Sequence, residues 1–475
     1  MGHRSVTRSS SEETETVSGT GTDLISPNIV TPKRLWYVAI VTMSIMLGAI
    51  LPWVPGKFQP TLLMLVPLFI GCFLIIMNPF IGVCGYVMYE YIRPDSFISA
   101  LRILKPAILL EALTLVGLLV HIIKTKEYPR WIGFNWLYLS FIIVVMLSGI
   151  TASNNSIAFE LFRALLINFT IFIMATTLLN SVERVHKFMW LLLIIHFYFA
   201  LKSIQTGGLV GGALMGDEND LALSLNIVIP FAFFMFVESK LNRIRIIGLA
   251  ALLALLFGVV ASMSRGGFVG MVVGVFFCIA ISKRKVLNLI ITLCVIAVIV
   301  PLIPQQYIAE IQTITNTHEA TAESRLNYWK AAYNMYLDHI IIGVGPGNGP
   351  YMMPEYYVFG VDNPEKQWGR TFHGTLPQVL AELGSLGILI YLILIVVGLK
   401  LLFTVRRRCL DPSDGLYKLL ANSILGGFVA YNVTAVFLST AYYPQLWTLY
   451  IAAIALYKCF IFRKDQPFTK PYLAK

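Results

Sequence analysis

The class of this fold is decided by residues 246–285, which read IIGLAALLALLFGVVASMSRGGFVGMVVGVFFCIAISKRK. The stretch contains two long apolar runs, 246–263 and 267–282, which meet at SRGG and end in the basic loop SKRK. An apolar helix of roughly 20 residues is long enough to cross the hydrocarbon core of a bilayer. The two runs therefore predict a pair of membrane-spanning helices joined by a short turn.

The same alternation of apolar runs and short polar loops continues along most of the 475-residue chain. Hydrophobic residues make up 57% of the sequence and charged residues 13%, whereas soluble domains carry about a quarter charged residues. This composition excludes an ordinary soluble domain. We predict an all-α polytopic membrane protein with about 12–14 transmembrane helices and one large, partly helical outer loop. The short run at 79–92 is compatible with a tilted helix or a re-entrant segment.

The positive charges indicate how the helices are oriented. Lysine and arginine gather in alternate loops, at 124–130, 180–187, 238–245, 282–285 and 406–418, and the loops between them hold few positive charges. Because cytoplasmic loops of membrane proteins are enriched in these residues, we expect the basic loops and both termini in the cytoplasm. The net charge of +11 thus indicates membrane orientation and does not require a nucleic-acid partner.

The expected domain organisation follows from this orientation. Residues 1–33 are rich in Ser, Thr and Glu, cannot bury a core and are predicted to be a disordered cytoplasmic tail. The remaining parts are transmembrane helices 1–11 at 34–303, a large periplasmic or extracellular loop at 304–377, transmembrane helices 12–14 at 378–462 and a cytoplasmic tail at 463–475.

The outer loop is too long for a simple connection and contains a predicted helix at 322–337. Apolar residues recur there at helical spacing and define one face, formed by Leu326, Trp329, Tyr333, Tyr336 and Leu337. Thr321 is the predicted N-cap of this helix. The glycine-rich GVGPGNG at 343–349 lacks the pattern of a phosphate-binding loop and is interpreted as a series of turns.

His373 lies immediately before the helix that follows the outer loop. Thr375 and Gln378 have the spacing of a capping box, which predicts a helix start near Leu376. The unperturbed imidazole pKa of about 6.5 suits a general base at neutral pH, and the positive end of the following helix favours the neutral ring. The alternative is an ordinary polar loop residue.

Three basic residues near the predicted outer face are candidates for binding an anion. Arg265 lies in SRGG at membrane depth, where its guanidinium can pair with a phosphate or snorkel to the lipid headgroups. Arg325, in the loop helix, is either a second anion ligand or a solvated surface charge. Lys202 lies near the outer end of an apolar run and is within reach of a lipid phosphate.

The other ionisable residues have structural explanations. Asp217 or Asn219, within GDEND, is expected to cap the next helix, and the absence of a DxD motif from the outer loop gives a metal ion little support. Glu111 and His196 lie within apolar runs and are expected to form a buried pair between helices. Six scattered cysteines without a CxxC pair indicate neither a disulfide framework nor a zinc site.

Three segments give the chain a resemblance to a known family. They are SRGG (264–267), ESRLNYWKAAYNMYLDHIIIGVGPGN (323–348) and HGTLPQVLAELGSLGILIYL (373–392). In this order and on one side of the membrane, they resemble the O-antigen ligase and polymerase superfamily of bacterial envelope enzymes, which includes protein O-oligosaccharyltransferases. The resemblance covers about residues 215–400. The family often has Asn or Ser where this chain has Gly374.

The resemblance implies an inverting, GT-C-like glycosyltransferase of the bacterial cytoplasmic membrane that needs no cofactor and no metal. Its donor would be a glycan on undecaprenyl diphosphate, and its acceptor a hydroxyl of a glycan, lipid or protein. The expected site residues are His373 as catalytic base, Arg265, Arg325 and Lys202 at the donor diphosphate, and Tyr328, Trp329 and Glu382 at the sugar or acceptor. Polymerase and ligase are equal alternatives, because both share the donor side.

A second interpretation is a transporter or flippase of polysaccharides or lipid-linked glycans, without bond chemistry. Many transporters contain paired repeats, with broken helices at matching positions around a site near the midplane. In this sequence the two halves differ, and the polar residues gather on one face. The ordered Arg, Arg and His around one loop also disfavour a purely structural scaffold.

Overall fold

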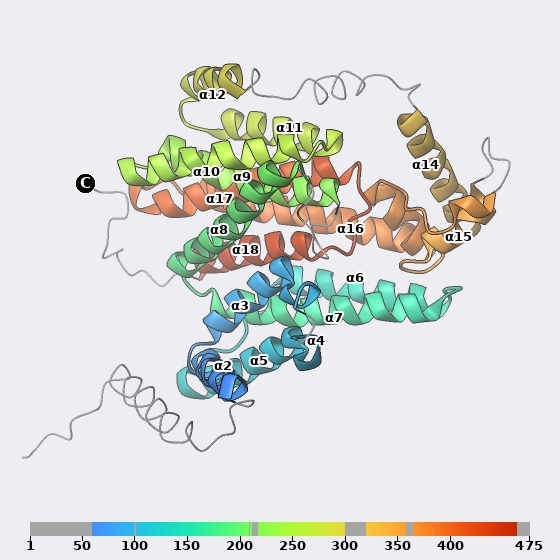
Figure 1. Ribbon diagram of the computed structural model, residues 1–475, viewed down its shortest axis with the longest axis horizontal. Helices are drawn as coiled ribbons and strands as arrows, with labels where there is room; N and C mark the ends of the chain where they lie inside the picture. Colours follow the sequence, from blue (N-terminus) through green and yellow to red (C-terminus); the bar gives the residue numbers. More distant parts are fainter. Residues whose placement is uncertain are drawn as a thin grey trace, which may run out of the picture. The chain divides into compact units, whose positions relative to one another are not determined.

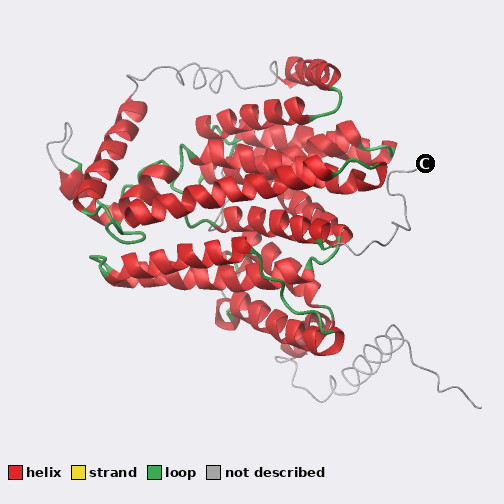
Figure 2. Ribbon diagram, turned by 180° about the vertical axis from the view of Figure 1, so that it is seen from behind, coloured by secondary structure: helices red, strands yellow, loops and turns green. Residues whose placement is uncertain are grey.

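The computed structural model describes residues 59–98, 101–208, 210, 217–299, 320–357 and 364–462. Within these residues every regular element is a helix, which confirms the predicted all-α class (Figure 2). The predicted tails at 1–33 and 463–475 lie outside the described residues.

The chain divides into two units, Met1–Gly71 and Cys72–Lys475. The beginning of α2 belongs to the first unit, and all features discussed below belong to the second. The described helices are α2 (Gln59–Met77), α3 (Pro79–Ile92), η3 (Pro94–Ser96), α4 (Leu101–Leu104), α5 (Pro106–Thr125), α6 (Gly133–Ile150), α7 (Asn155–Leu178), α8 (Val182–Thr206), α9 (Glu218–Glu238), α10 (Asn242–Ala261), α11 (Arg265–Ile281), α12 (Lys285–Ile299), α14 (Ala320–Asp338), α15 (Gly349–Tyr356), η6 (Pro364–Gln367), α16 (Thr375–Arg408), η7 (Pro412–Asp414), α17 (Gly415–Ala435) and α18 (Pro444–Ile461) (Figure 1).

Eight helices of the described part are long and apolar enough to cross a membrane, namely α5, α6, α7, α8, α9, α10, α16 and α18. Shorter apolar stretches accompany them at Leu68–Met77, Arg265–Ile281 and Lys285–Cys294. These helices confirm a polytopic membrane protein. The short run at 79–92 is the 14-residue helix α3, which packs against α5 and α8. The side of the membrane on which each loop lies stays a prediction.

Helix α9 forms the centre of the bundle, where it contacts α8, α10, α11 and α17. Figure 1 shows α9, α10 and α17 side by side. Glycines allow the close packing: Gly427 of α17 lies directly against the Ile227 carbonyl of α9. A Cβ on Gly270 of α11 would come within 3.0 Å of the Ala430 carbonyl oxygen. Small residues let membrane helices approach one another closely, which strengthens their van der Waals packing.

Helix α16 is interrupted at Gly384, whose φ of 62° and ψ of −158° are not helical. Only glycine adopts this region without strain. A larger residue would also lack space at this position, because a Cβ at Gly384 would come within 2.6 Å of the Ile341 carbonyl. The glycine therefore permits both the bend of α16 and the close approach of the turn that follows α14.

The backbone groups released by this bend are bonded to the same turn. The Ser385 N–H donates to the Ile340 carbonyl over 2.7 Å, and the Val344 N–H donates to the Ala381 carbonyl over 2.9 Å. A helix can be broken within a membrane protein only where other protein groups satisfy its backbone. The predicted turns at 343–349 are confirmed: Gly343, Gly345 and Gly347 have positive φ values.

We expect Gly384→Ala to destabilise the protein by about 3 kcal/mol, since strain and a backbone clash both act at this position. The matched control is Gly133→Ala, because nothing lies within 4 Å of a Cβ at Gly133. Apparent melting temperatures of the two purified variants in detergent provide the test. Equal melting temperatures would contradict this account of the bend.

The predicted loop helix is confirmed as α14, but the predicted apolar face is only partly packed: Trp329 and Tyr336 bond to residues just before and within α16, and the other three residues are about half exposed. Leu326, Tyr333 and Leu337 are 45%, 53% and 47% exposed. The residues that pack inward are Tyr328, Ala331, Ala332 and Met335. The two alanines allow α14 to approach α16 closely. Thr321 is not the cap, because the helix already begins at Ala320.

The predicted start of α16 is confirmed, but the predicted capping box is wrong. The helix begins at Thr375 after an N-cap without a side-chain hydrogen bond. The Thr375 hydroxyl donates to the Leu438 carbonyl over 2.6 Å, and the Gln378 side-chain oxygen accepts from the Ala441 N–H over 3.2 Å. Both side chains therefore join α16 to the loop between α17 and α18.

The expected pairing of Glu111 with His196 is also wrong. His196 is fully buried in α8, where its Nδ1 lies 2.7 Å from the Leu192 carbonyl and its ring packs edge-on against Tyr91. Within the described residues no hydrogen bond or ion pair connects His196 to Glu111. The Nδ1 atom of His196 is thus bonded within its own helix, and its ring packs against a ring of α3.

Candidate functional site

His373 lies in the turn that precedes α16 and has a φ of +50°. A positive φ is uncommon for a residue other than glycine, and such strain persists only where the surroundings impose it. The surroundings here include α14, because the Trp329 indole N–H donates to the Phe372 carbonyl over 3.1 Å. A Cβ on Gly374 would lie 2.8 Å from the Trp329 indole nitrogen. The turn around His373 therefore depends on the packing of α14.

The electrostatic surroundings of His373 favour a neutral imidazole. Burial is the main cause that lowers the pKa of His373; the cations of Arg325 and, more weakly, Arg370 lower it further, and the Asp217 carboxylate opposes them. A neutral ring can accept a proton at physiological pH. Arg325, which was expected at the site, thus lies close enough to act on His373. The influence of Arg370 and Asp217 was not expected.

The ring of Tyr328 lies next to His373, with the two ring centroids 5.9 Å apart. Tyr328 is itself part of a small core, because its ring centroid lies 5.0 Å from that of Tyr357 and its hydroxyl donates to Gln367 over 3.1 Å. Burial raises the pKa of this phenol. Of the predicted sugar-binding residues, Tyr328 and Trp329 therefore both lie beside the His373 turn.

Arg265 is the first residue of α11 and follows the N-cap Ser264. The Ser264 hydroxyl donates to the Asn219 side-chain oxygen over 2.7 Å, and the Asn219 N–H donates to the Asp217 carboxylate over 2.6 Å. Asp217 is the N-cap of α9, which confirms one of the two predicted caps. The beginnings of α9 and α11, with Arg265, are thus hydrogen-bonded to each other.

The loop between α17 and α18 connects these helix starts to that of α16. The Tyr443 hydroxyl donates to Asp220 at the start of α9 over 3.4 Å. Gly266 of α11 packs against the Phe437 side chain, and the Thr375 hydroxyl of α16 bonds to this loop at Leu438. Arg265, Arg325 and His373 therefore lie on elements that converge at one end of the bundle.

Lys202 lies near the end of α8. Its neighbour Ser203 donates to the Gly258 carbonyl of α10 over 2.9 Å, which places Lys202 near the end of α10. In the described residues no hydrogen bond or ion pair connects the Lys202 ammonium to His373, Arg265 or the loop helix. Its assignment to the donor diphosphate stays a prediction.

Glu382 is enclosed within the protein and is only 1% exposed. Its carboxylate accepts hydrogen bonds from the Tyr442 hydroxyl over 2.8 Å, from the Gln378 amide over 3.4 Å and from the backbone N–H groups of Gly347 and Gly349. The carboxylate therefore joins α16, the glycine-rich turns and the loop before α18. Its contact with a sugar stays a prediction.

Sequence reasoning missed Arg370, Tyr442 and Tyr443 as parts of this region. A weak signal was present for each, because Arg370 lies three residues before His373 and the tyrosines lie in a short polar connection between two apolar runs. The described residues contain no group of three or more His, Cys, Asp or Glu side chains that is arranged to hold a metal ion. Independence of metal ions stays a prediction.

Comparison with known proteins relates part of the chain to a family. Residues 249–392 match the family model described as O-antigen ligase. The match includes Arg265, Arg325, His373 and Glu382 and leaves out Lys202. The chain is also 26% identical over 232 residues to the teichuronic acid biosynthesis protein TuaE of Bacillus subtilis (strain 168), which covers 46% of each chain. The chain thus spans just under half the length of this curated relative.

Proposed function

We propose that the chain is a member of the O-antigen ligase and polymerase superfamily, which its matches to the O-antigen ligase family model and to TuaE support, and that it is a membrane glycosyltransferase. It transfers a glycan from an undecaprenyl-diphosphate carrier to an acceptor hydroxyl at the outer face of the cytoplasmic membrane. The observation that carries the proposal is the strained, half-buried His373 beside Arg325, in a turn that α14 holds in place.

The reaction proceeds as a single displacement. The acceptor hydroxyl attacks the anomeric carbon while its proton passes to the neutral imidazole of His373. The bond between that carbon and the diphosphate oxygen breaks, and its electron pair stays with the diphosphate. Attack from the face opposite the leaving group inverts the anomeric configuration. Because the diphosphate bond is already activated, the transfer needs no nucleotide.

The positive residues act on the leaving group. As the bond breaks, negative charge develops on the bridging oxygen, and cations that are already in place stabilise it without reorganisation. Arg325 and Arg265 supply guanidinium forks that match phosphate oxygens. Lys202 is the third proposed ligand, on the side of the bundle where α8 and α10 end. Trp329 and Tyr328 supply aromatic faces beside the base.

The proposed function is tested by a donor-consumption assay. Purified protein in liposomes receives the lipid-diphosphate glycan and an acceptor, and both the free carrier diphosphate and the glycan length are followed. Release of the carrier with a growing lipid-linked ladder identifies a polymerase, and transfer to another acceptor identifies a ligase. If folded wild-type protein moves the donor across the membrane but releases no carrier, the chain is a transporter and the proposal is wrong.

The low pKa of His373 leads to a pH prediction. Since protonation removes the base, kcat/KM falls on the acid side, and the fall is expected below the ordinary imidazole pKa of about 6.5. Arg370→Gln removes a cation that lowers the pKa of His373, so the fall of kcat/KM on the acid side (the acid limb of the pH profile) should move to higher pH. Lys366→Gln is the control, because Lys366 is not among the groups that act on His373. An identical acid limb in wild type and Arg370→Gln would contradict the assignment of His373 as the base.

A further inference from the structure

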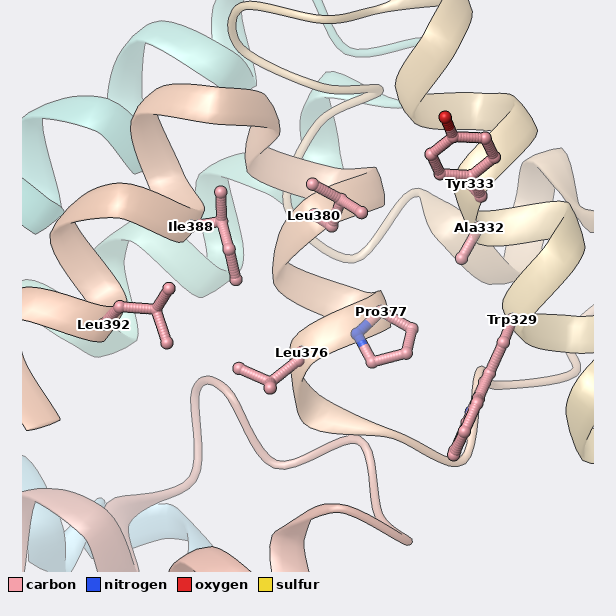
Figure 3. Close-up of a pocket in the computed structure, with 8 residues that line it drawn as sticks. All are labelled: Trp329, Ala332, Tyr333, Leu376, Pro377, Leu380, Ile388 and Leu392. Carbon is pink, nitrogen blue, oxygen red and sulfur yellow. The ribbon is translucent and has the colours of Figure 1, made fainter.

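An apolar groove of about 360 Å³ lies between α14 and α16. Its lining is formed by Trp329, Ala332, Tyr333, Leu376, Pro377, Leu380, Ile388 and Leu392. Figure 3 shows Trp329, Ala332 and Tyr333 on α14, with the other five side chains along α16. The Tyr333 hydroxyl is the one hydroxyl in this lining. A ligand of the groove is therefore a hydrocarbon rather than a sugar or a peptide.

The bend in α16 shapes this groove. Leu376, Leu380, Ile388 and Leu392 follow one another at intervals of four residues, with Gly384 at the missing step. Residues four apart lie on one face of a helix. The position without a side chain coincides with the break in the helix. The groove thus continues past the bend, from the first turn of α16 into its membrane-spanning part.

The two ends of the groove differ in charge. At one end, Trp329 also bonds to the Phe372 carbonyl, and Leu376 follows the His373 turn. Arg325 lies one turn before Trp329 on α14, and its charge acts on His373. At the other end, Leu392 is 43% exposed on a helix that is apolar enough to cross a membrane. The surface therefore fits a molecule with an anionic head and a long hydrocarbon chain.

We propose that this groove binds the first isoprene units of the donor's lipid carrier. The inference rests on the proposed function, because that function supplies an isoprenoid diphosphate as the substrate. A chain that lies along Leu392, Leu380 and Leu376 leads its diphosphate toward Arg325 and its reactive carbon toward His373. An ordinary phospholipid can place an acyl chain on the same surface, but it has no diphosphate-linked sugar to present to the base. The groove therefore sets the position of the donor along the membrane.

The test combines labelling with kinetics. An isoprenyl diphosphate with a diazirine in its chain is photolysed with wild-type protein and with Leu392→Trp, which fills the groove. We expect labelling at the α14 and α16 lining, and a loss of about tenfold or more in the variant, because the apolar contact is removed. Leu389→Trp is the matched control, because Leu389 is 56% exposed on the same helix and does not line the groove.

The kinetic measurement also shows whether the variant is folded. In Leu392→Trp, KM for the full-length carrier should rise by about tenfold, whereas KM for a two-isoprene donor, which does not reach Leu392, should stay unchanged. An equal loss with both donors, or an equal effect of Leu389→Trp, would overturn the proposal. So would labelling that phosphatidylglycerol competes away as well as undecaprenyl diphosphate does.

The experiments distinguish a wrong assignment of the groove from a wrong proposed function, because photolabelling requires no turnover. If wild-type protein transfers glycan but is labelled elsewhere, the groove assignment is wrong and the transferase stands. If the groove is labelled and no carrier is ever released, the protein binds the lipid without being a transferase.

Discussion

Replacing His373 with glutamine is expected to lower the rate of glycan transfer by about 10²- to 10⁴-fold, the range that a positioned general base contributes. Glutamine keeps a polar side chain of similar length but does not accept the proton at neutral pH. The effect should appear in kcat, since the imidazole acts on the acceptor proton in the transition state. Binding of the lipid donor, which depends on the arginines and the groove, should change little.

The matched control for this experiment is His339→Gln. His339 is exposed after the end of α14, and the contacts of its backbone do not depend on the imidazole. Carrier release by His339→Gln should equal that of wild type. If His373→Gln and wild type release the carrier at the same rate, His373 is not the base. An unchanged melting temperature for His373→Gln separates lost chemistry from lost folding.

The second large effect is expected at Glu382, where leucine should destabilise the protein by about 3 kcal/mol or more. The loss of the carboxylate leaves the Tyr442 hydroxyl, the Gln378 amide and the N–H groups of Gly347 and Gly349 without their buried acceptor. Each unsatisfied buried donor costs about 1–3 kcal/mol. Apparent melting temperatures in detergent measure the effect.

A graded series separates this structural role from contact with a sugar. Tyr442→Phe removes one donor and keeps the carboxylate, so it should cost about 1 kcal/mol. Glu382→Gln keeps one acceptor oxygen and should fall between Tyr442→Phe and Glu382→Leu. A role in acceptor binding alone predicts the opposite pattern, in which KM for the acceptor rises while all three melting temperatures match wild type. That outcome would contradict the stabilising role of Glu382.

The boundaries of the elements near the site follow closely from local sequence. Asp217 caps α9 and α16 begins at Thr375, both at or within a residue of the predicted positions, and α11 begins at Arg265, two residues before the predicted run. Gly343, at the start of the glycine-rich segment, adopts the expected positive φ. These features are local, because an apolar helix in a bilayer satisfies its own backbone and its ends are set by nearby polar residues.

The partners of individual side chains did not follow from spacing. Leu326 and Tyr333 fit the helical spacing of apolar residues but are about half exposed. Helix α14 packs partly through two buried alanines, which a search for bulky apolar residues overlooks. Thr375 has the spacing of a cap, yet its hydroxyl bonds to Leu438. His196 was paired with Glu111 and instead packs against Tyr91. For Thr375, a partner distant in sequence replaced the one expected from local spacing.

The sequence by itself determined that this chain is a polytopic helical membrane protein, that α9 and α16 begin near Asp217 and Thr375, and which family the chain resembles, because hydropathy and helix-start signals are properties of short segments. The tertiary structure alone decided that Asp217 and Arg325 influence one histidine, that Glu382 is enclosed by the glycine-rich turns, and that α14 and the bent α16 leave an apolar groove between them. Such features depend on contacts between side chains that are distant in sequence. These contacts are determined by how the shapes of the side chains pack together, and not by their spacing along the chain.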